Sequence, residues 1–401
     1  MDKLQTLQEK LNKFGKYLYV YVAPSKADFN RDNIPDKYLA AASGNAVRGV
    51  DAFRQLIAET DIPYLVCADA KDQLRHPAFY HSGIHWSRTF EQETSAYLVK
   101  EFARITGKNY RNICLGEVKA SSTPYWRDAD VYNLLNVWDE PDETYYEYTS
   151  EVEAKENYDK IGILLQGDSF GRGLREDILN LYPLENIYRI DYDQYWEDRT
   201  GAIHKIDSWK ALDLSRMLDQ SDIVVIEFTE PNVKENSWGF VDYLIDFLDN
   251  YELGSGGSNY VKALNLDSDE AWNSDSLGGM YSREAGFVWA KGYSGVILEN
   301  TELASTGLEL ELSISALLFN ENGSAAVIDI FVNGTKLTSR EFHEAWDGSI
   351  IIAPEELAKV ADGDVYDIEI YCSKSFQPSA LGISADSREL AIQVRYVGCV
   401  R

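Results

Sequence analysis

The sequence has few basic side chains and no long hydrophobic run. Its 401 residues include 38 Lys and Arg against 66 Asp and Glu, which gives a formal net charge of −28. A field of this sign repels phosphate groups, and no stripe of Lys and Arg interrupts it, so we expect no binding to nucleic acid or to an anionic membrane surface. No run of about 18 apolar residues is present, and the residues after Met1 lack the composition of a signal peptide, so we expect neither a spanning helix nor a leader in this sequence.

Cysteine and histidine, two common metal ligands, are also scarce. There are four cysteines, none in C-x-x-C spacing: Cys67, Cys114, Cys372 and Cys399. We expect buried free thiols, and a Cys372–Cys399 disulfide in an oxidising compartment is the alternative. Of the five histidines, His81 and His85 stand four residues apart, but Ser82 and Gly83 between them favour a turn over a helix. We therefore expect no metal site and no cofactor.

What is present in quantity is apolar and aromatic residues, at 45% and 12%, which excludes a mainly disordered chain. Over residues 1–253, segments with helical spacing alternate with short apolar runs. Helices are predicted at 4–14, 47–60, 87–106, 173–181, 209–218 and 240–250, and strands at 17–23, 64–67, 161–166, 187–191 and 223–228. This alternation predicts an α/β domain, in which helices cover both faces of a parallel sheet.

A second domain is predicted beyond a Gly- and Ser-rich linker at residues 254–258. Within 259–401, strands are predicted at 296–298, 308–314, 326–332, 349–352, 366–371 and 390–397, and Asn333-Gly334 predicts a tight hairpin. This spacing favours an antiparallel β-sandwich. An acidic, tyrosine-rich stretch at about 139–159 interrupts the first domain; it lacks a calcium-loop motif, and we interpret it as a solvated insertion.

Ser169 is the strongest candidate nucleophile. It lies in Gly167-Asp168-Ser169-Phe170, directly after the buried strand predicted at 161–166 and before a helix. A serine at this position lies at the carboxyl edge of a parallel sheet, where the ligand crevices of α/β folds form. The N-terminus of the following helix offers backbone N–H donors to a developing oxyanion. Asn232 follows the strand at 223–228 and either donates to the same oxyanion or caps the next helix.

The loop around Ser169 has the spacing of neither common phosphate-binding motif, G-x-x-x-x-G-K-[ST] or G-x-G-x-x-G. Together with Gly83-Ile84-His85-Trp86-Ser87 upstream, it resembles instead the SGNH-hydrolase-like polysaccharide O-acetyltransferases, the family of the alginate O-acetylation proteins. In that family the His-Trp pair precedes the serine, the reverse of ordinary SGNH esterases, and this chain has that order. Further matching segments are Val22-Ala23-Pro24-Ser25-Lys26, Asn33-Ile34-Pro35 and Asp130-Val131-Tyr132-Asn133-Leu134-Leu135. The resemblance covers about residues 10–250 and implies an SGNH-like, flavodoxin-like sheet.

The resemblance implies that Ser169 is acylated by an acetyl donor and that His85 is its general base. The oxyanion would be held by the amides of Ser169 and Gly171 and by Asn232, and Trp86 would contribute to substrate binding.

One position departs from the family. Where the family has an aspartate two residues before the histidine, this chain has Gly83. An acid orients the imidazole and stabilises its charged form, so its loss is costly unless another carboxylate replaces it. Asp69, Asp130 and Glu230 are the candidates. Three outcomes stay open: a displaced acid, a Ser–His dyad, or weak activity.

The second domain is similar to β-sandwich modules of glycan-handling enzymes, a likeness carried by segments around Tyr281, Trp289 and Phe376. Trp289 and Trp346 either stack on sugars or belong to the core. We therefore expect an O-acetyltransferase of a bacterial cell-surface or exopolysaccharide, with a polysaccharide acceptor and an acetyl donor supplied by a membrane acyltransferase. The family implies an extracellular or cell-surface location behind an N-terminal membrane anchor. The alternatives are a carbohydrate acetyl esterase using the same residues and a non-catalytic glycan-binding scaffold.

Overall fold

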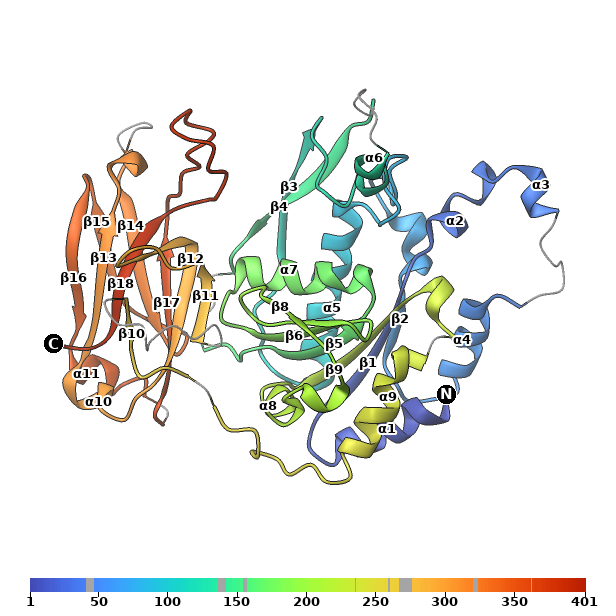
Figure 1. Cartoon of the computed structure of the whole chain (residues 1–401), viewed down its shortest axis with the longest axis horizontal. Coiled ribbons are helices and arrows are strands. Elements are labelled where there is room, and N and C mark those ends of the chain that lie inside the picture. The colour runs from blue at the N-terminus through green and yellow to red at the C-terminus, as the bar shows by residue number, and fades with distance from the viewer. Residues whose placement is uncertain are drawn as a thin grey trace.

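The computed structural model describes residues 1–40, 47–135, 142–153, 157–234, 236–258, 260–266, 276–319, 324–361 and 363–401. Two units lie side by side (Figure 1): an α/β unit, and an all-β unit formed by the carboxyl-terminal part of the chain. The chain between α9 and β10 runs along the lower edge of the view and joins them. Both parts of the predicted fold class, a parallel sheet covered by helices and an antiparallel β-sandwich, are confirmed.

The α/β unit is built on a seven-stranded sheet in the order β2-β1-β9-β5-β6-β7-β8. The strands are β1 (Tyr17–Ala23), β2 (Tyr64–Val66), β5 (Gly162–Gly167), β6 (Asn186–Asp191), β7 (Tyr195–Glu197), β8 (Ile203–Lys205) and β9 (Ile223–Thr229). The first five in sheet order are parallel, and β7 and β8 add an antiparallel edge. If β5, β6, β9, β1 and β2 are numbered 1 to 5, their order across the sheet is 2-1-3-4-5, which is the flavodoxin order. Because the chain here begins with strands 4 and 5 of that numbering, the fold is a circular permutation of the flavodoxin topology.

Alternation along each central strand divides the core between two faces. In β1, Leu18, Val20 and Val22 face one cluster of apolar side chains, and Tyr19 and Tyr21 face the other. The first cluster is covered by α1 (Asp2–Asn12), α4 (Gly49–Ile57), α8 (Leu214–Asp219) and α9 (Phe240–Phe247). The second is covered by α5 (Arg88–Thr106) and α7 (Arg172–Leu181). Because both faces are buried, most side chains of the central strands are apolar; Gln166, Arg189 and Glu227 are buried polar exceptions.

Two local elements differ from the sequence prediction. Part of the acidic stretch at about 139–159 forms β4 (Tyr145–Glu151), which pairs with β3 (Cys114–Ser121) in a separate two-stranded sheet beside α6 (Asp130–Leu134). Tyrosines at alternate and neighbouring positions favour a strand there, against the charge that suggested a solvated loop. Residues 139–141 and 154–156 of that stretch lie outside the described residues. The predicted helix at 209–218 divides into a 3-10 turn, Trp209–Ala211, and α8.

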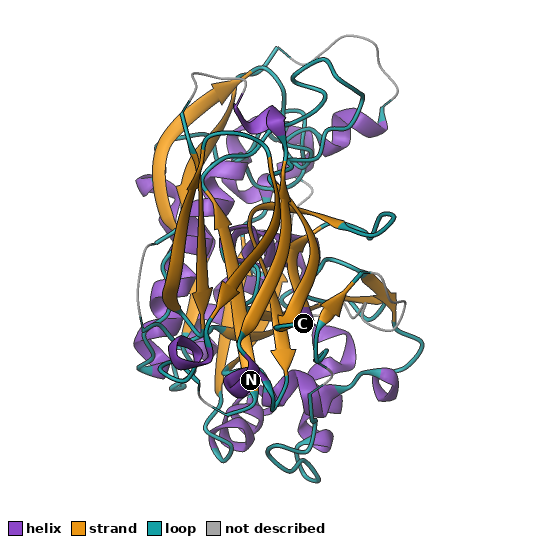
Figure 2. Ribbon diagram, turned by 90° about the vertical axis from the view of Figure 1, so that its left-hand side faces the viewer, coloured by secondary structure: helices purple, strands orange, loops and turns teal. Residues whose placement is uncertain are grey.

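The all-β unit is one antiparallel sheet folded over a shared core, and its strands run side by side in the foreground of Figure 2. Its main strands are β12 (Val288–Glu299), β13 (Leu308–Ile314), β14 (Ala326–Val332), β15 (Thr335–Phe342), β16 (Trp346–Ile352), β17 (Val365–Cys372) and β18 (Ile392–Cys399). The short strand β10 (Leu264–Asn265) pairs with β18, and the short strand β11 (Leu277–Met280) pairs with β12. Two short helices, α10 (Leu303–Thr306) and α11 (Pro354–Leu357), lie between strands. Asn333-Gly334 forms the predicted hairpin, with both φ angles positive, at 47° and 75°.

A buried ionic cluster fixes the two units to one another. Arg111, whose side chain is only 2% exposed, donates to Glu185 of the α/β unit at 2.8 Å and to Glu369 of the all-β unit at 3.2 Å. Tyr293 and Tyr158 each donate to the same Glu369 carboxylate at 2.8 Å. The position of the all-β unit relative to the sheet therefore depends on specific buried pairs.

None of the helices in the described ranges is both long and apolar enough to cross a membrane. All four cysteines are free; Cys67 and Cys372 are buried, and Cys114 and Cys399 are partly exposed. The domain border predicted at residues 253–259 stays a prediction.

Candidate active site

Ser169 lies where β5 ends, at the first residue of a 3-10 turn, Ser169–Gly171, that leads into α7. β5 and β9 are neighbours and occupy the first and third places of the flavodoxin order. The space between these two strands is the topological switch point of the sheet. Doubly wound sheets bind their ligands there, beyond the carboxyl ends of the strands.

The neighbouring Asp168 side chain holds this turn in place. One carboxylate oxygen accepts the Phe170 amide at 3.0 Å. The other accepts the Thr229 amide and hydroxyl and the Asn232 side-chain amide, at 3.1, 2.8 and 2.9 Å. Asp168 thereby joins the loops after β5 and β9, so Ser169 rests on a fixed support.

A buried carboxyl group and an arginine support the same turn from below. Glu227 of β9 accepts the Asp168 amide at 2.8 Å, and Arg189 of β6 donates to the Asp168 carbonyl at 2.9 Å. Burial, and next the nearby Asp168 charge, raises the pKa of Glu227 well above its usual value. This environment favours the neutral form of the Glu227 carboxyl group beneath Ser169.

His85 contacts both Ser169 and a carboxylate. Its Nε2 lies 2.8 Å from Ser169 Oγ, and its Nδ1 lies 2.7 Å from Asp130 Oδ2. The ring packs against Phe170, with ring centres 4.7 Å apart. Burial lowers the pKa of His85, and the hydrogen bond with Asp130 opposes this effect. The neutral imidazole can accept a proton from Ser169, and Asp130 is placed to stabilise the imidazolium that results.

Of the three candidate acids, Asp130 alone contacts His85 within the described chain. It is the first residue of α6, and its second oxygen accepts the Ile84 amide at 2.8 Å, which orients the carboxylate. Asp69 pairs with Arg54 at 2.7 Å, and Glu230 accepts the Ser25 amide at 3.2 Å.

The backbone explains why position 83 carries no acid. A Cβ on Gly83 would lie 2.5 Å from the Asp128 carbonyl oxygen and 2.8 Å from that of Arg127. The segment that carries Asp130 thus passes so close to Gly83 that no side chain fits between them. The carboxylate reaches His85 from this neighbouring segment instead.

Two charged side chains secure the loop that carries His85. Lys26 donates to the carbonyls of Tyr80, His81 and Gly83 at 2.7, 3.2 and 2.5 Å. The Glu143 carboxylate accepts the amides of His81 and Ser82 at 2.6 and 3.0 Å. Lys26 belongs to a segment singled out in the sequence, and its role here is to bind the histidine loop.

The other predicted site residues lie close by in different settings. Trp86 is buried, with 3% exposure; its indole N–H donates to Glu91 and its ring packs on Phe170, so it supports the loop from the core and offers no face to a substrate. The Gly171 amide already donates to the Asp168 carbonyl at 3.1 Å. The Asn232 amide nitrogen donates to Asp168, and its second N–H is the one left to aim at an oxyanion.

Sequence reasoning missed Tyr192, directly after β6. Its phenol hydrogen-bonds with Ser169: burial raises the pKa of Tyr192, and hydrogen bonding with the Ser169 side chain and backbone opposes this rise. The residue has a positive φ of 53°, and its ring packs edge-on against Trp238 at 5.0 Å. The sequence offered one signal for this residue: Tyr192 follows the strand predicted at 187–191, and side chains at the carboxyl ends of parallel strands lie near the site.

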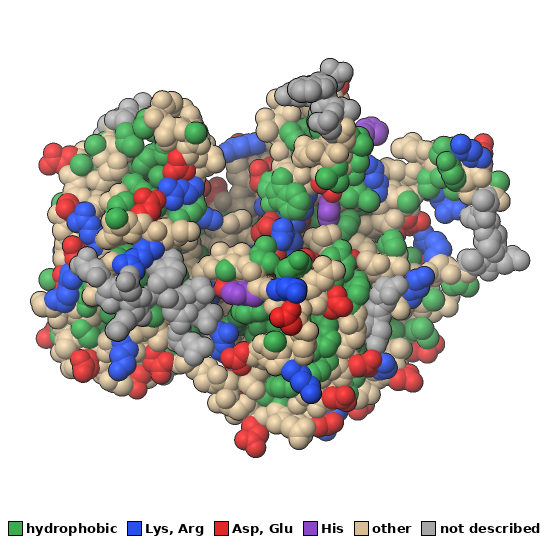
Figure 3. Space-filling model, in the orientation of Figure 1, with side chains coloured by type: hydrophobic (Ala, Val, Ile, Leu, Met, Phe, Trp, Pro, Cys, Tyr) green, Lys and Arg blue, Asp and Glu red, His purple; other side chains and the backbone are tan. Residues whose placement is uncertain are grey.

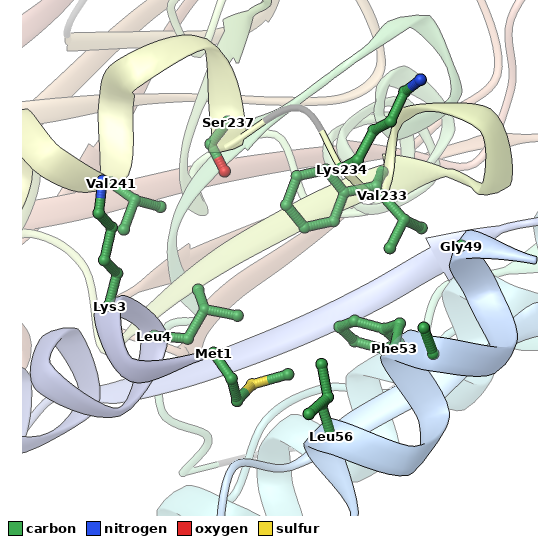
Figure 4. A pocket seen from close by; sticks show the side chains of 12 residues that line it. Met1, Lys3, Leu4, Gly49, Phe53, Leu56, Val233, Lys234, Ser237 and Val241 are labelled. Atoms are coloured by element: carbon green, nitrogen blue, oxygen red, sulfur yellow. The ribbon is translucent and has the colours of Figure 1, made fainter. Parts of the chain in front are cut away.

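No cluster of three or more metal-ligating side chains occurs among the described residues. A cavity of about 340 Å³ lies between α1, α4 and the segment after β9, and its lining is mostly apolar, with Lys3, Lys234 and Ser237 among the residues around it (Figure 4). Phe228 and Phe53 in its wall belong to the opposite face of the sheet from Phe170 and Trp86.

The face seen in Figure 3 carries both acidic and basic side chains and is notched at the top between the two units.

Comparisons with known proteins found no matching family model and no matching curated protein sequence. Among solved structures, AlgX of Pseudomonas aeruginosa has 13% identity and a TM-score of 0.40, over 100% of this chain and 88% of its own. The O-acetyltransferase domain of Pseudomonas putida AlgJ has 14% identity and a TM-score of 0.38, over 61% and 88%. PatB1 of Bacillus cereus has 10% identity and a TM-score of 0.36, over 58% and 88%. Each is a weak structural likeness of this chain.

Proposed function

We propose that this protein is a serine-dependent O-acetyltransferase that acetylates hydroxyl groups of a bacterial cell-surface or exopolysaccharide. The observation that carries the proposal is the relay from Ser169 through His85 to Asp130, with contacts of 2.8 and 2.7 Å. Nucleophile, base and acid at such distances are the arrangement that acyl transfer through a serine requires.

In the first half-reaction, Ser169 Oγ attacks the carbonyl carbon of an acetyl ester while His85 Nε2 takes the hydroxyl proton. The second N–H of Asn232 stabilises the tetrahedral oxyanion, together with the Ser169 amide once that amide exchanges the Tyr192 phenol for the oxyanion. The intermediate collapses, the ester bond breaks, and His85 returns the proton to the departing alcohol oxygen. The products are acetyl-Ser169 and the free alcohol.

In the second half-reaction, a sugar hydroxyl attacks acetyl-Ser169. His85 takes the proton of that hydroxyl, and the second tetrahedral intermediate releases Ser169 Oγ, which recovers the proton from His85. A new ester forms on the sugar and one breaks on the enzyme. Water in place of the sugar would make the same residues an esterase.

We propose transfer to a glycan because the motifs of His85 and Ser169 resemble those of the polysaccharide O-acetyltransferases. In both, the His-Trp pair precedes the serine, which is the reverse of the order in ordinary SGNH esterases. The same resemblance supports a cell-surface location behind a membrane anchor and an acetyl donor delivered by a membrane acyltransferase. Glycan binding by the all-β unit, through Trp289 and Trp346, belongs to the same proposal.

The test is incubation with p-nitrophenyl acetate as donor, with and without oligosaccharides, followed by intact-protein and peptide mass analysis. We expect one added acetyl group on the peptide that contains Ser169, and acetylated sugar when an acceptor is present. Ser169→Ala removes both, and Ser305→Ala, a change at an exposed serine on α10, leaves both unchanged.

The outcomes separate the candidate functions. Ser169-dependent release of acetate with no acetylated sugar, over a panel of acceptors, assigns the esterase reaction. Absence of any Ser169-dependent acylation or ester turnover contradicts the enzyme proposal altogether and favours a glycan-binding scaffold.

A further inference from the structure

One large aromatic side chain beside the relay is exposed. Trp126 is 46% exposed, and its ring centre lies 6.4 Å from that of His85. An apolar ring of this size in water is unfavourable by itself, and exposed aromatic side chains at a reaction centre are typical of binding surfaces. Trp86, the tryptophan that the sequence indicated for substrate binding, is buried.

The indole of Trp126 is held in place by arginines. The guanidinium of Arg127 lies 5.2 Å from its ring centre and that of Arg172 lies 5.9 Å from it. Glu176 of α7 contacts both arginines, at 2.6 and 3.9 Å. Cation–π contacts from two anchored guanidiniums restrict the ring before any ligand arrives, which reduces the entropic cost of stacking on it.

The same segment carries the ring and the acid of the relay. Trp126 stands four residues before Asp130, and the turn between them is closed by a hydrogen bond from the Asp128 amide to the Tyr125 carbonyl, at 2.8 Å. Ser82, three residues before His85, donates to the Asp128 carbonyl at 3.1 Å. The ring and the imidazole therefore keep a fixed relative position, which productive alignment of an acceptor needs.

We propose that the exposed face of Trp126 is the platform of the acceptor subsite, on which the C–H-rich face of a pyranose ring stacks with one hydroxyl directed toward His85. The proposal rests on the proposed function and names the substrate class that its second half-reaction takes.

The charges around the platform indicate a neutral or weakly charged sugar. Arg127 is paired with Glu91 at 3.0 Å and with Glu176, and Arg172 is paired with Glu197 at 2.6 Å. Because carboxylates already balance these guanidiniums, neither offers the free cation that a strongly anionic acceptor would require.

The kinetic test compares Trp126→Ala and Trp126→Phe in acetyl transfer to neutral oligosaccharides. Trp126→Ala should raise the KM of the acceptor about tenfold to a hundredfold and lower kcat by about threefold or less, because stacking is lost while the relay stays in place. Trp126→Phe keeps a flat ring and should stay within about fivefold of the original KM. Tyr97→Ala, a change at an equally exposed aromatic on α5 that lines a separate cavity, should change neither value.

A binding test reads the subsite without catalysis. Ser169→Ala protein, labelled at its nine tryptophan indoles, is titrated with cello-, xylo-, manno- and chitohexaose and with an oligogalacturonate, and the Trp126 signal is identified by its loss in Trp126→Phe. We expect a neutral hexaose to shift that signal. We also expect the affinity for the hexaose to fall by about tenfold or more when Trp126→Ala is added to the Ser169→Ala protein.

The proposal is overturned if no sugar moves the Trp126 signal, if the anionic oligomer binds there in preference to the neutral ones, or if Trp126→Ala lowers kcat with the acceptor KM unchanged. Failure of the proposed function gives a different result: incubation with the acetyl donor, without any sugar, would then produce no acetyl-Ser169.

Discussion

The Asp130 carboxylate lies 2.7 Å from Nδ1 of His85, although 45 residues separate the two in the sequence. The contact exists because the loop after β3 passes directly over Gly83, where the Cβ of any other residue would meet the Asp128 carbonyl at 2.5 Å. The acid therefore comes from the neighbouring segment.

Asp130→Asn should lower kcat/KM for acetyl-ester turnover by about a hundredfold to ten-thousandfold, because the imidazolium loses its partner and the tautomer its orientation. Steady-state hydrolysis of p-nitrophenyl acetate measures this. Asp69→Asn, at an exposed pair with Arg54, is the matched control and should change the rate by less than about twofold. Equal effects of the two variants would contradict the assignment of Asp130.

The pH profile gives an independent measurement. Burial lowers the pKa of His85, so the neutral base persists below its usual pKa of about 6.5, and the acid limb of kcat/KM should have its midpoint below that value. The bond with Asp130 raises the same pKa, so its removal in Asp130→Asn should move the limb to still lower pH. A limb that moves to higher pH in this variant would contradict the relay.

Gly83→Ala should reduce activity and stability together. The added methyl would overlap the carbonyls of Arg127 and Asp128, and relieving such a clash costs about 1–3 kcal/mol and displaces the segment that carries Asp130. Urea denaturation and ester hydrolysis measure the two effects. Gly49→Ala meets nothing within 4 Å and should be tolerated. Gly83→Asp, which writes the family motif into this chain, should inactivate the enzyme for the same reason.

Lys26→Met should loosen the loop of His85, because three carbonyls lose a shared cationic donor; we expect a loss of about 1–3 kcal/mol and a lower kcat. Protection of the amides around His85 in hydrogen exchange should fall with it. Lys71→Met removes a lysine that donates to one carbonyl, that of Phe29, and serves as the control. Unaltered exchange around His85 would show that the loop does not depend on Lys26.

Arg111→Met should destabilise the protein by about 3–5 kcal/mol, because Glu185 and Glu369 would stay buried without their cation. Chemical denaturation measures the loss, and limited proteolysis of the chain between α9 and β10 reports whether the two units separate. Arg104→Met, at an exposed pair with Glu101, should be neutral. A stable Arg111→Met protein with intact units would contradict the role of this cluster.

Local patterns were sufficient for most of the fold. Tyr17–Ala23 is a strand because its apolar run is buried on both faces, and Ser87 begins α5 by accepting the Phe90 amide, as Ser, Thr and Asp do at helix starts. The Asn-Gly hairpin follows from the positive φ that only such residues adopt readily. The strand at Tyr145–Glu151 was not predicted, because its acidic residues indicated a solvated loop. Its pairing with β3 is a long-range contact that local patterns do not show.

The alternation of strands and helices, the second all-β unit, and the two motifs that carry Ser169 and His85 can be predicted from the amino-acid sequence, because each depends on neighbouring residues. The folded chain alone reveals which carboxylate reaches His85, that Trp86 is buried, and that Trp126 is exposed beside the relay. Those relationships join segments far apart in the chain, and backbone packing such as the close approach of Gly83 to Asp128 sets them.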